Sequence, residues 1–268
     1  MTTNRITSLQ NPHVKNLTLL ATKSRTRKEQ NLFIIEGRRE IERAGKSGYT
    51  FHSCYYCPEI IKQESTDLLK SLAKGVEFFE VSSSVYSKIA YREATDGIIV
   101  TAFMQDKKLS ELKLRENPLI LILESVEKPG NLGAVLRTAD AAGVDAVIIC
   151  DPQTDLYNPN VVRSSLGCLF SNQIVCCESN DAIRFLKEKR INIFAAALQN
   201  SVLYQNENYT GGSALVMGGE ADGLSEIWRN SADRIVKIPM AGIADSLNVS
   251  VSAAILVFEA VRQRSSIS

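Results

Sequence analysis

Short hydrophobic runs alternate with amphipathic, helix-like stretches along this chain, which is typical of an α/β protein. The clearest run is residues 119–123, which is apolar at every position, as in a strand covered on both faces of a parallel sheet. A helix is expected to follow over residues 131–142. Similar apolar runs recur at residues 146–149, 193–198, 214–217 and 235–238. This βα alternation predicts a mostly parallel sheet in the second half of the chain.

The first half has the pattern of a second, smaller α/β domain. Asn11-Pro12 begins a helix that carries Val14, Leu17, Leu20 and Ala21 on one face. A short strand is expected at residues 31–35, with a helix from Gly37. Further strands are expected at residues 51–56, 76–81 and 97–103.

A charged stretch separates the two halves. Residues 106–118 have few bulky apolar side chains and end in Asn117-Pro118, a turn signal. We therefore expect a domain over residues 1–105, a linker over 106–118 and a second domain over 119–268.

Composition narrows the setting in which the protein works. Hydrophobic residues make up 44% of the chain, but no window of eighteen is apolar, and the N-terminus lacks the apolar core of a signal peptide. A cytoplasmic location with reduced cysteines is expected. Cys54-x-x-Cys57 has the spacing of half a zinc site, but Cys176 and Cys177 are adjacent and cannot supply the other half. The cysteines are interpreted as small buried residues, and no metal is expected.

Charge is distributed unevenly along the chain. Residues 1–50 hold ten lysines and arginines against four acids, a net of +6, whereas the whole chain carries +1, so the remainder carries −5. A basic segment of this kind suits a polyanionic partner. A solvated helix face would have the same composition, and charge alone does not separate the two.

Three unusual loops follow predicted strands, where ligands bind in α/β sheets. In the first, after residues 119–123, Asn131 could cap the next helix and Arg137 lies further along that helix. Taken alone, Asn131 is interpreted as an ordinary cap and Arg137 as a surface residue that forms salt bridges.

The second loop, residues 218–225, is rich in glycine, which lets backbone amides approach a ligand closely. It matches neither G-x-G-x-x-G nor a P-loop, so a dinucleotide or ATP site is unsupported. An ordinary glycine-rich turn would look similar.

The third loop leads from Ile238 through Ser246 and Asn248 into a helix of small residues. Ser and Asn near the start of this helix suit an N-cap, and the helix could also be part of a dimer interface. The only histidines are His13 and His52, both in the first half, so the sequence offers no Ser-His-Asp set. The three loops together indicate group transfer by positioning and hydrogen bonding, with a cofactor carrying the reactive group.

The ordered combination of these loops resembles the three motifs of the SpoU/TrmH-type RNA ribose 2′-O-methyltransferases of the SPOUT superfamily. The family motif Asn-x-Gly-Ala, with Arg four residues after that Gly, matches Asn131 to Arg137. Gly-x-Glu-x-x-Gly-Leu matches residues 218–224, with Ala221 where the family usually has Gly. Ile-Pro-Met-x-Gly and Ser-Leu-Asn-Val-Ser match residues 238–242 and 246–250. The first half resembles, less specifically, the family's L30e-like substrate-binding domain through residues 6–15 and 33–37.

The resemblance implies a deep trefoil knot in the second domain and a homodimer whose active sites draw on both subunits. It implies S-adenosylmethionine as cofactor, held mainly by backbone groups of Gly218, Ile238, Met240 and Leu247, together with Asn248. The residues that it assigns to catalysis are Arg137, Asn131, Glu220, Ser246 and Asn248. An arginine normally stays protonated, so we expect Arg137 to polarise the hydroxyl or steer a phosphate rather than act as a free base.

The function expected from this resemblance is methylation of a ribose 2′-hydroxyl in RNA. A separate N-terminal domain favours ribosomal over transfer RNA by analogy. The basic segment is then interpreted as an RNA surface that includes Lys23, Arg25, Arg27, Lys28 and Arg38. The competing hypothesis is a non-catalytic RNA-binding or ribosome-assembly factor that retains the fold. The intact polar residues of all three motifs argue against it.

Overall fold

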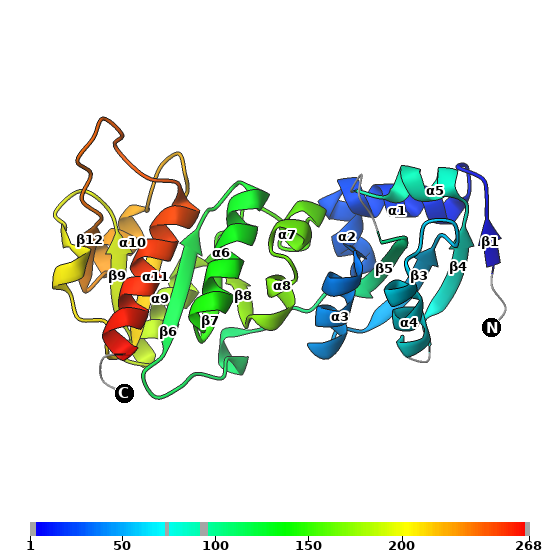
Figure 1. Ribbon diagram of the computed structural model, residues 1–268. Coiled ribbons are helices and arrows are strands. Elements are labelled where there is room, and N and C mark those ends of the chain that lie inside the picture. The colour runs from blue at the N-terminus through cyan, green and yellow to red at the C-terminus, as the bar shows by residue number, and fades with distance from the viewer. Residues whose placement is uncertain (1–3, 73–74, 92–95, 266–268) are drawn as a thin grey trace. The chain divides into compact units, whose positions relative to one another are not determined.

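The structure is a computed structural model that describes residues 4–72, 75–91 and 96–265. The chain divides into two compact units, shown as ribbons in Figure 1. The first unit comprises residues 1–105 together with residues 155–171, and the second comprises residues 106–154 and 172–268. Among the described residues, no helix is both long and apolar enough to cross a membrane.

The first unit contains a mixed five-stranded sheet. In order across the sheet, the strands are β1 (Asn4–Ile6), β4 (Glu77–Val81), β3 (Phe51–Tyr56), β5 (Ile98–Phe103) and β2 (Leu32–Glu36). β3 pairs in parallel with β4 and antiparallel with β5, and β2 pairs antiparallel with β5. All five residues of β2 are buried. The α/β character predicted for this half is confirmed, and β1 is an additional strand.

Helices from both parts of the first unit pack on this sheet. They are α1 (Pro12–Thr22), α2 (Ser24–Gln30), α3 (Arg38–Lys46), α4 (Gln63–Ser71), α5 (Ser83–Ile89), α7 (Pro159–Ser164) and α8 (Cys168–Ser171). α1 begins as predicted, with the Asn11 side chain accepting a hydrogen bond from the His13 backbone N–H, and Val14, Leu17 and Leu20 are buried. α7 contacts β2 and α8 contacts α3, so residues 155–171 belong to this core, although in the chain they follow β7 (Ala146–Cys150), a strand of the second unit.

The second unit is built on a seven-stranded sheet in which every strand pair is parallel. Its strands, in order across the sheet, are β10 (Val202–Leu203), β12 (Arg234–Lys237), β9 (Asn192–Ala196), β11 (Ser213–Met217), β6 (Leu119–Glu124), β7 (Ala146–Cys150) and β8 (Ile174–Cys177). All six residues of β6 are buried, as expected for a central parallel strand. The predicted parallel sheet is confirmed. β8 and β10 are additional strands, because runs of four and two residues carry little periodic signal.

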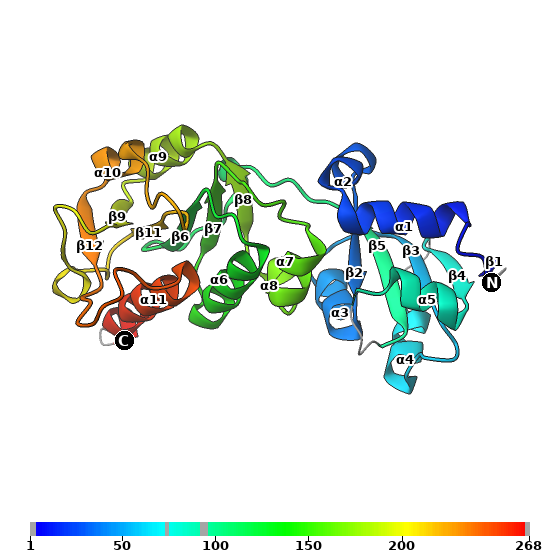
Figure 2. The same cartoon turned by 90° about the horizontal axis from the view of Figure 1, so that it is seen from above.

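Helices cover both faces of this sheet. Figure 2 shows α6 (Pro129–Ala142) and α11 (Val249–Ser265) on one face and α9 (Ser179–Glu188) and α10 (Glu226–Ser231) on the other. α6 begins with Pro129 in its first turn, a position that suits proline because the backbone N–H there needs no intrahelical partner. The expected cap Asn131 therefore lies inside the first turn, and the residue at the cap position is Lys128.

The chain doubles back near its C-terminal end. β12 lies two strands away from β11, yet α11 packs against α6, β11 and β6. The segment at residues 238–248, which is largely exposed, therefore returns the chain across the ends of β9 and β11. Such a return past earlier loops is what the expected knot requires.

Candidate active site

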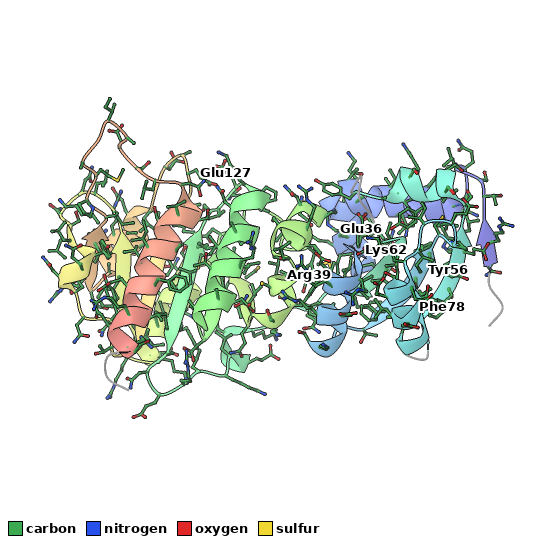
Figure 3. All side chains as sticks on the ribbon, viewed as in Figure 1. Glu36, Arg39, Tyr56, Lys62, Phe78 and Glu127 are labelled. Atoms are coloured by element: carbon green, nitrogen blue, oxygen red, sulfur yellow. The ribbon has the colours of Figure 1, made fainter. Side chains whose placement is uncertain are left out.

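The three motif loops meet at one edge of the parallel sheet, beyond the C-terminal ends of β6, β11 and β12. This edge is uppermost in Figure 1, where α6 begins, and Figure 3 labels Glu127 beside it. An open cavity of about 590 Å³ is lined there by Lys128, by the loop at residues 217–224 and by residues 246–249. A smaller cavity of about 130 Å³ shares Ser246 and Leu247 with it. The larger cavity is thus lined by residues from all three loops that the sequence analysis singled out.

The glycine loop after β11 is folded so tightly that a side chain would not fit at Gly218 or Gly219. A Cβ atom on Gly218 would lie 2.1 Å from the carbonyl carbon of Gly223, and one on Gly219 would lie 2.9 Å from the Ser125 carbonyl oxygen. Gly223 has a φ of +65° and donates its N–H to the Gly219 carbonyl. Only glycine tolerates such close backbone approaches, so this loop is more than an ordinary turn. Ala221, the departure from the family pattern, is exposed.

A buried carboxylate ties the glycine loop to the central strand. Glu124 is the last residue of β6 and is 5% exposed. Its Oε2 accepts a hydrogen bond of 2.8 Å from the backbone N–H of Ser225, the residue that precedes α10. This hydrogen bond thus joins the end of β6, where the first loop begins, to the end of the glycine loop.

Three predicted catalytic side chains form one hydrogen-bonded cluster. The Asn131 amide donates to Glu220 Oε1, and Asn248 Nδ2 donates to Asn131 Oδ1 at 3.1 Å. Asn248 also caps α11, because its Oδ1 accepts from the Ser250 N–H at 2.9 Å. The N-cap expected at this helix is confirmed. The cluster brings together residues up to 117 positions apart in the sequence, one from each motif.

The residues expected to hold a cofactor line the two cavities. Ile238, Met240 and Leu247 line the smaller cavity, whereas Gly218, Leu247 and Asn248 line the larger one. Ser246, which was predicted to be a catalytic residue, lines both cavities. The sequence interpretation missed residues 196–198, which also line both cavities. The signal that could have identified them is their place at the C-terminal end of β9, where ligands bind in parallel sheets.

Arg137 lies apart from this cluster. It is an exposed residue of α6, six positions after Asn131 and therefore roughly 9 Å further along the helix. It lines neither cavity, and within the described part of the chain its side chain has no hydrogen-bond or ion-pair partner.

The five basic residues expected to contact RNA differ in exposure. Lys23 and Lys28 are exposed, Arg25 is 88% exposed with an i,i+4 pair to Glu29, and Arg38 is 42% exposed. Arg27 is 2% exposed, and its guanidinium binds the Asp155 carboxylate and the Leu20 carbonyl. A phosphate cannot reach Arg27 in this structure, so we leave it out of the RNA surface.

The cysteines do not form a metal centre among the described residues, where no group of three His, Cys, Asp or Glu side chains is placed to hold an ion. Cys54, Cys57, Cys150 and Cys168 are buried. Burial raises the pKa of the Cys54 thiol. A hydrogen bond with Cys177, together with burial, raises the pKa of Cys150. Buried thiols of this kind are unreactive at neutral pH.

Comparison with known proteins gives the family. Residues 118–258 match the model of the SpoU rRNA Methylase family, and residues 11–100 match an MRM3-like substrate binding domain. The chain is 32% identical over 254 residues to the 23S rRNA (guanosine(2553)-2′-O)-methyltransferase RlmP of Bacillus subtilis. That alignment covers 95% of this chain and 98% of the relative.

Solved structures agree with this match. An AdoMet-bound rRNA methyltransferase from Sinorhizobium meliloti superposes with a TM-score of 0.89 at 31% identity, covering 97% of this chain and 98% of that one. The SpoU methyltransferase AviRb from Streptomyces viridochromogenes, in complex with the cofactor AdoMet, has a TM-score of 0.89 at 27% identity and covers 96% and 99%. The expected knotted fold is thereby confirmed, and the chain belongs to the SpoU rRNA methylase family.

Proposed function

We propose that this protein transfers the methyl group of S-adenosylmethionine to a ribose 2′-hydroxyl of ribosomal RNA. The observation that carries the proposal is the Glu220–Asn131–Asn248 cluster, in which one residue from each motif is hydrogen-bonded and Glu220 and Asn248 line the larger cavity. The names of the relatives support ribosomal RNA as the substrate class. An enzyme acting on that RNA would work in the cytoplasm.

The two cavities fit the cofactor in size and chemistry. The smaller has apolar walls that suit a flat base, including Ile238, Met240 and Leu256. The larger, about 590 Å³, lies within the range of small-molecule sites and includes the acids Glu220 and Asp222, which suit a cationic ligand. Backbone groups at Gly218 and Leu247 would hold the bound molecule. When bound, the cofactor supplies a methyl group that is already an activated electrophile.

The work left to the protein is mainly alignment. A ribose hydroxyl is a weak nucleophile at neutral pH, so holding its oxygen in line with the methyl group removes much of the barrier. Asn131 and Asn248 would shape the site around that oxygen, with Glu220 fixing the Asn131 amide. Arg137 would polarise the hydroxyl or bind the adjacent phosphate, because arginine side chains in general do not serve as free bases.

We propose that Arg137 serves the cavity of a second subunit in a homodimer. Two observations support this arrangement: Arg137 is exposed on α6 and lines neither of the two cavities described above, and α11, which packs beside α6, exposes Val251 and Phe258 at 46% and 47%. Exposed apolar side chains seven positions apart lie on one helix face and suit a protein partner. If Arg137→Ala and Asn131→Ala are each inactive, a mixed dimer of the two should regain activity at one intact site. No regain in purified mixed dimers would contradict the shared site.

The first unit would bind the RNA outside the catalytic cavity. Its exposed cations Lys23, Arg25 and Lys28, together with the half-buried Arg38, are suited to phosphate contacts, which would make binding strongly dependent on salt. The alternative of a non-catalytic assembly factor would require neither cofactor binding nor an intact polar cluster.

The decisive test supplies the full-length protein with unmodified 23S rRNA transcript and methyl-labelled S-adenosylmethionine. Nuclease digestion and mass spectrometry should detect a 2′-O-methylated nucleoside. Arg137→Ala should lower the single-turnover rate by about a hundredfold or more, with unchanged cofactor affinity in calorimetry. The matched control is Arg184→Ala on α9, an exposed arginine whose ion-pair partner among the described residues is Asp181. Label on a base, or cofactor binding without transfer to RNA, would refute the proposal. A near-normal rate for Arg137→Ala would refute only its assigned role.

A further inference from the structure

Two cations that lack a partner among the described residues line the larger cavity. Lys128 is exposed and immediately precedes α6, whereas Arg229 is half-buried on α10. Both line the larger cavity, together with residues of the motif loops. Within the part of the chain that the structure describes, neither side chain forms a hydrogen bond or an ion pair.

Most other arginines of the second unit have structural partners. Four are ion-paired with acids, and a fifth donates to backbone carbonyls; these are Arg115, Arg184, Arg234, Arg262 and Arg264. Arg137 and Arg190 have no described partner either, but both are exposed and outside the two cavities. Arg229 is therefore distinguished by being half-buried, without a described partner and at the cavity wall. A guanidinium that has lost part of its hydration gains most from a bound anion.

The acids near the cavity do not neutralise these cations. Glu220 accepts the Asn131 amide and, at 3.5 Å, the Glu127 N–H. Asp222 is exposed and is not ion-paired to a described residue. Both acids suit the cationic part of the cofactor, which leaves Lys128 and Arg229 available for an anion.

The positions of the two cations point to an extended ligand. Lys128 belongs to the start of α6 and Arg229 to α10, and these helices cover opposite faces of the sheet (Figure 2). A ligand that contacts both must cross the C-terminal edge of the strands, over the cavity. An RNA strand delivering a ribose to this cavity carries a phosphate on each side of that ribose.

We infer that Lys128 and Arg229 bind backbone phosphates of the RNA strand beside the methylated ribose and so position its 2′-hydroxyl. This inference rests on the proposed function. The other anion that could occupy this place is the carboxylate of S-adenosylmethionine, and the two sources predict different measurements.

The test compares Lys128→Gln, Arg229→Gln and the double variant with Lys187→Gln, which removes an exposed charge on α9 that lines neither cavity. Binding of the full-length protein to a 23S rRNA transcript is measured at several salt concentrations. Each cavity variant should bind about tenfold more weakly. The slope of log affinity against log salt should become shallower by about 0.7 for each phosphate of single-stranded RNA that the variant no longer neutralises. Lys187→Gln should match the wild type in affinity and slope.

Two further readouts separate positioning from other roles. Calorimetry with S-adenosylmethionine alone should give wild-type affinity for every variant. The KM for RNA should rise, while the single-turnover rate at saturating RNA should fall less than the affinity. Wild-type RNA affinity and salt slope in the double variant would overturn the inference. Weakened cofactor binding with intact RNA binding would also overturn it and assign the cations to the carboxylate. A wild-type protein that methylates no RNA would instead refute the proposed function.

Discussion

Gly218 leaves β11 directly against the backbone of Gly223, and a Cβ atom there would lie 2.1 Å from the Gly223 carbonyl carbon. Gly130, in the first turn of α6, has open space around the same position. A side chain would therefore clash with the backbone at Gly218 but would fit at Gly130. The first fixes the shape of the cavity wall, whereas the second only lowers the helix propensity of α6.

We therefore expect Gly218→Ala to disrupt the glycine loop and to weaken S-adenosylmethionine binding by at least about tenfold, because backbone atoms cannot yield as a flexible side chain can. Gly130→Ala should keep wild-type cofactor affinity and should raise the free energy of unfolding by about 0.5 kcal/mol. Calorimetry and chemical denaturation measure the two quantities. Wild-type cofactor affinity in Gly218→Ala would show that the loop does not shape the site.

The basic segment of residues 1–50 shows that the surroundings of a residue decide whether its side chain is exposed. Arg25 and Arg27 have the same side chain, are two positions apart and lie in the same helix, so composition treats them alike. In the structure Arg25 is 88% exposed and Arg27 is 2% exposed, with its charge paired to Asp155. The side chain and its place in the segment could be read from the sequence, but its partner 128 positions away could not.

At the scale of elements, Asp145 holds the start of β6 to the stretch before it. Its carboxylate, whose side chain is 3% exposed, accepts hydrogen bonds from the Arg115 guanidinium and from the backbone N–H groups of Arg115 and Leu119. Burial opposes the charged form, but these hydrogen bonds and the Arg115 charge together hold the pKa of Asp145 below its usual value.

A depressed folded-state pKa means that Asp145 stabilises the fold fully above its unfolded pKa of about 3.9. That contribution is lost as the pH falls through the folded pKa. Asp145→Asn should lower the free energy of unfolding by about 2 kcal/mol at pH 7. The deficit should be similar at pH 6 and should shrink below about pH 4. Chemical denaturation over this range checks the trend, with the more exposed Asp181→Asn as a nearly neutral control. A deficit that grows on acidification would contradict this assignment.

The element pattern was largely predictable where periodicity is strong. β3 begins and ends at the predicted residues, β6 and β11 agree within one residue at each end, and α1 begins where it was predicted to begin. Helix starts were less predictable. Asparagine is a common N-cap residue, so Asn131 was predicted to cap α6. Pro129 begins the helix two residues earlier, however, and the Asn131 side-chain amide is hydrogen-bonded to Glu220 and Asn248.

At the scale of the whole molecule, residues 155–171 belong to the first unit although they follow β7 in the chain. Val161, Val162, Leu169 and Phe170 of this segment are each 3% exposed or less. The sequence suggested a simple division at residues 106–118, because the linker is the visible change in composition. Nothing local to residues 155–171 shows that their apolar side chains complete the core of the other unit.

Removing residues 1–105 should therefore expose these apolar side chains. We expect the fragment 106–268 to aggregate beyond a dimer, because an uncovered apolar patch associates. Size-exclusion chromatography with light scattering measures this outcome. The same fragment with Val162→Ser and Phe170→Ser should aggregate less. If the fragment without the serine substitutions were monodisperse, the apolar side chains of residues 155–171 would not need residues 1–105 to cover them.

The sequence by itself determined the α/β class, the parallel strands of the second unit and the three motif loops, because each is encoded by a local pattern of apolar spacing, glycine or capping residues. Resemblance to a known family added the knot and the cofactor. Only the tertiary structure decided that Asn131, Glu220 and Asn248 contact one another, that residues 196–198 join the cavity wall, that Arg137 lies outside the cavity and that Arg27 is buried. These facts depend on packing between segments up to 128 positions apart, which local periodicity does not encode.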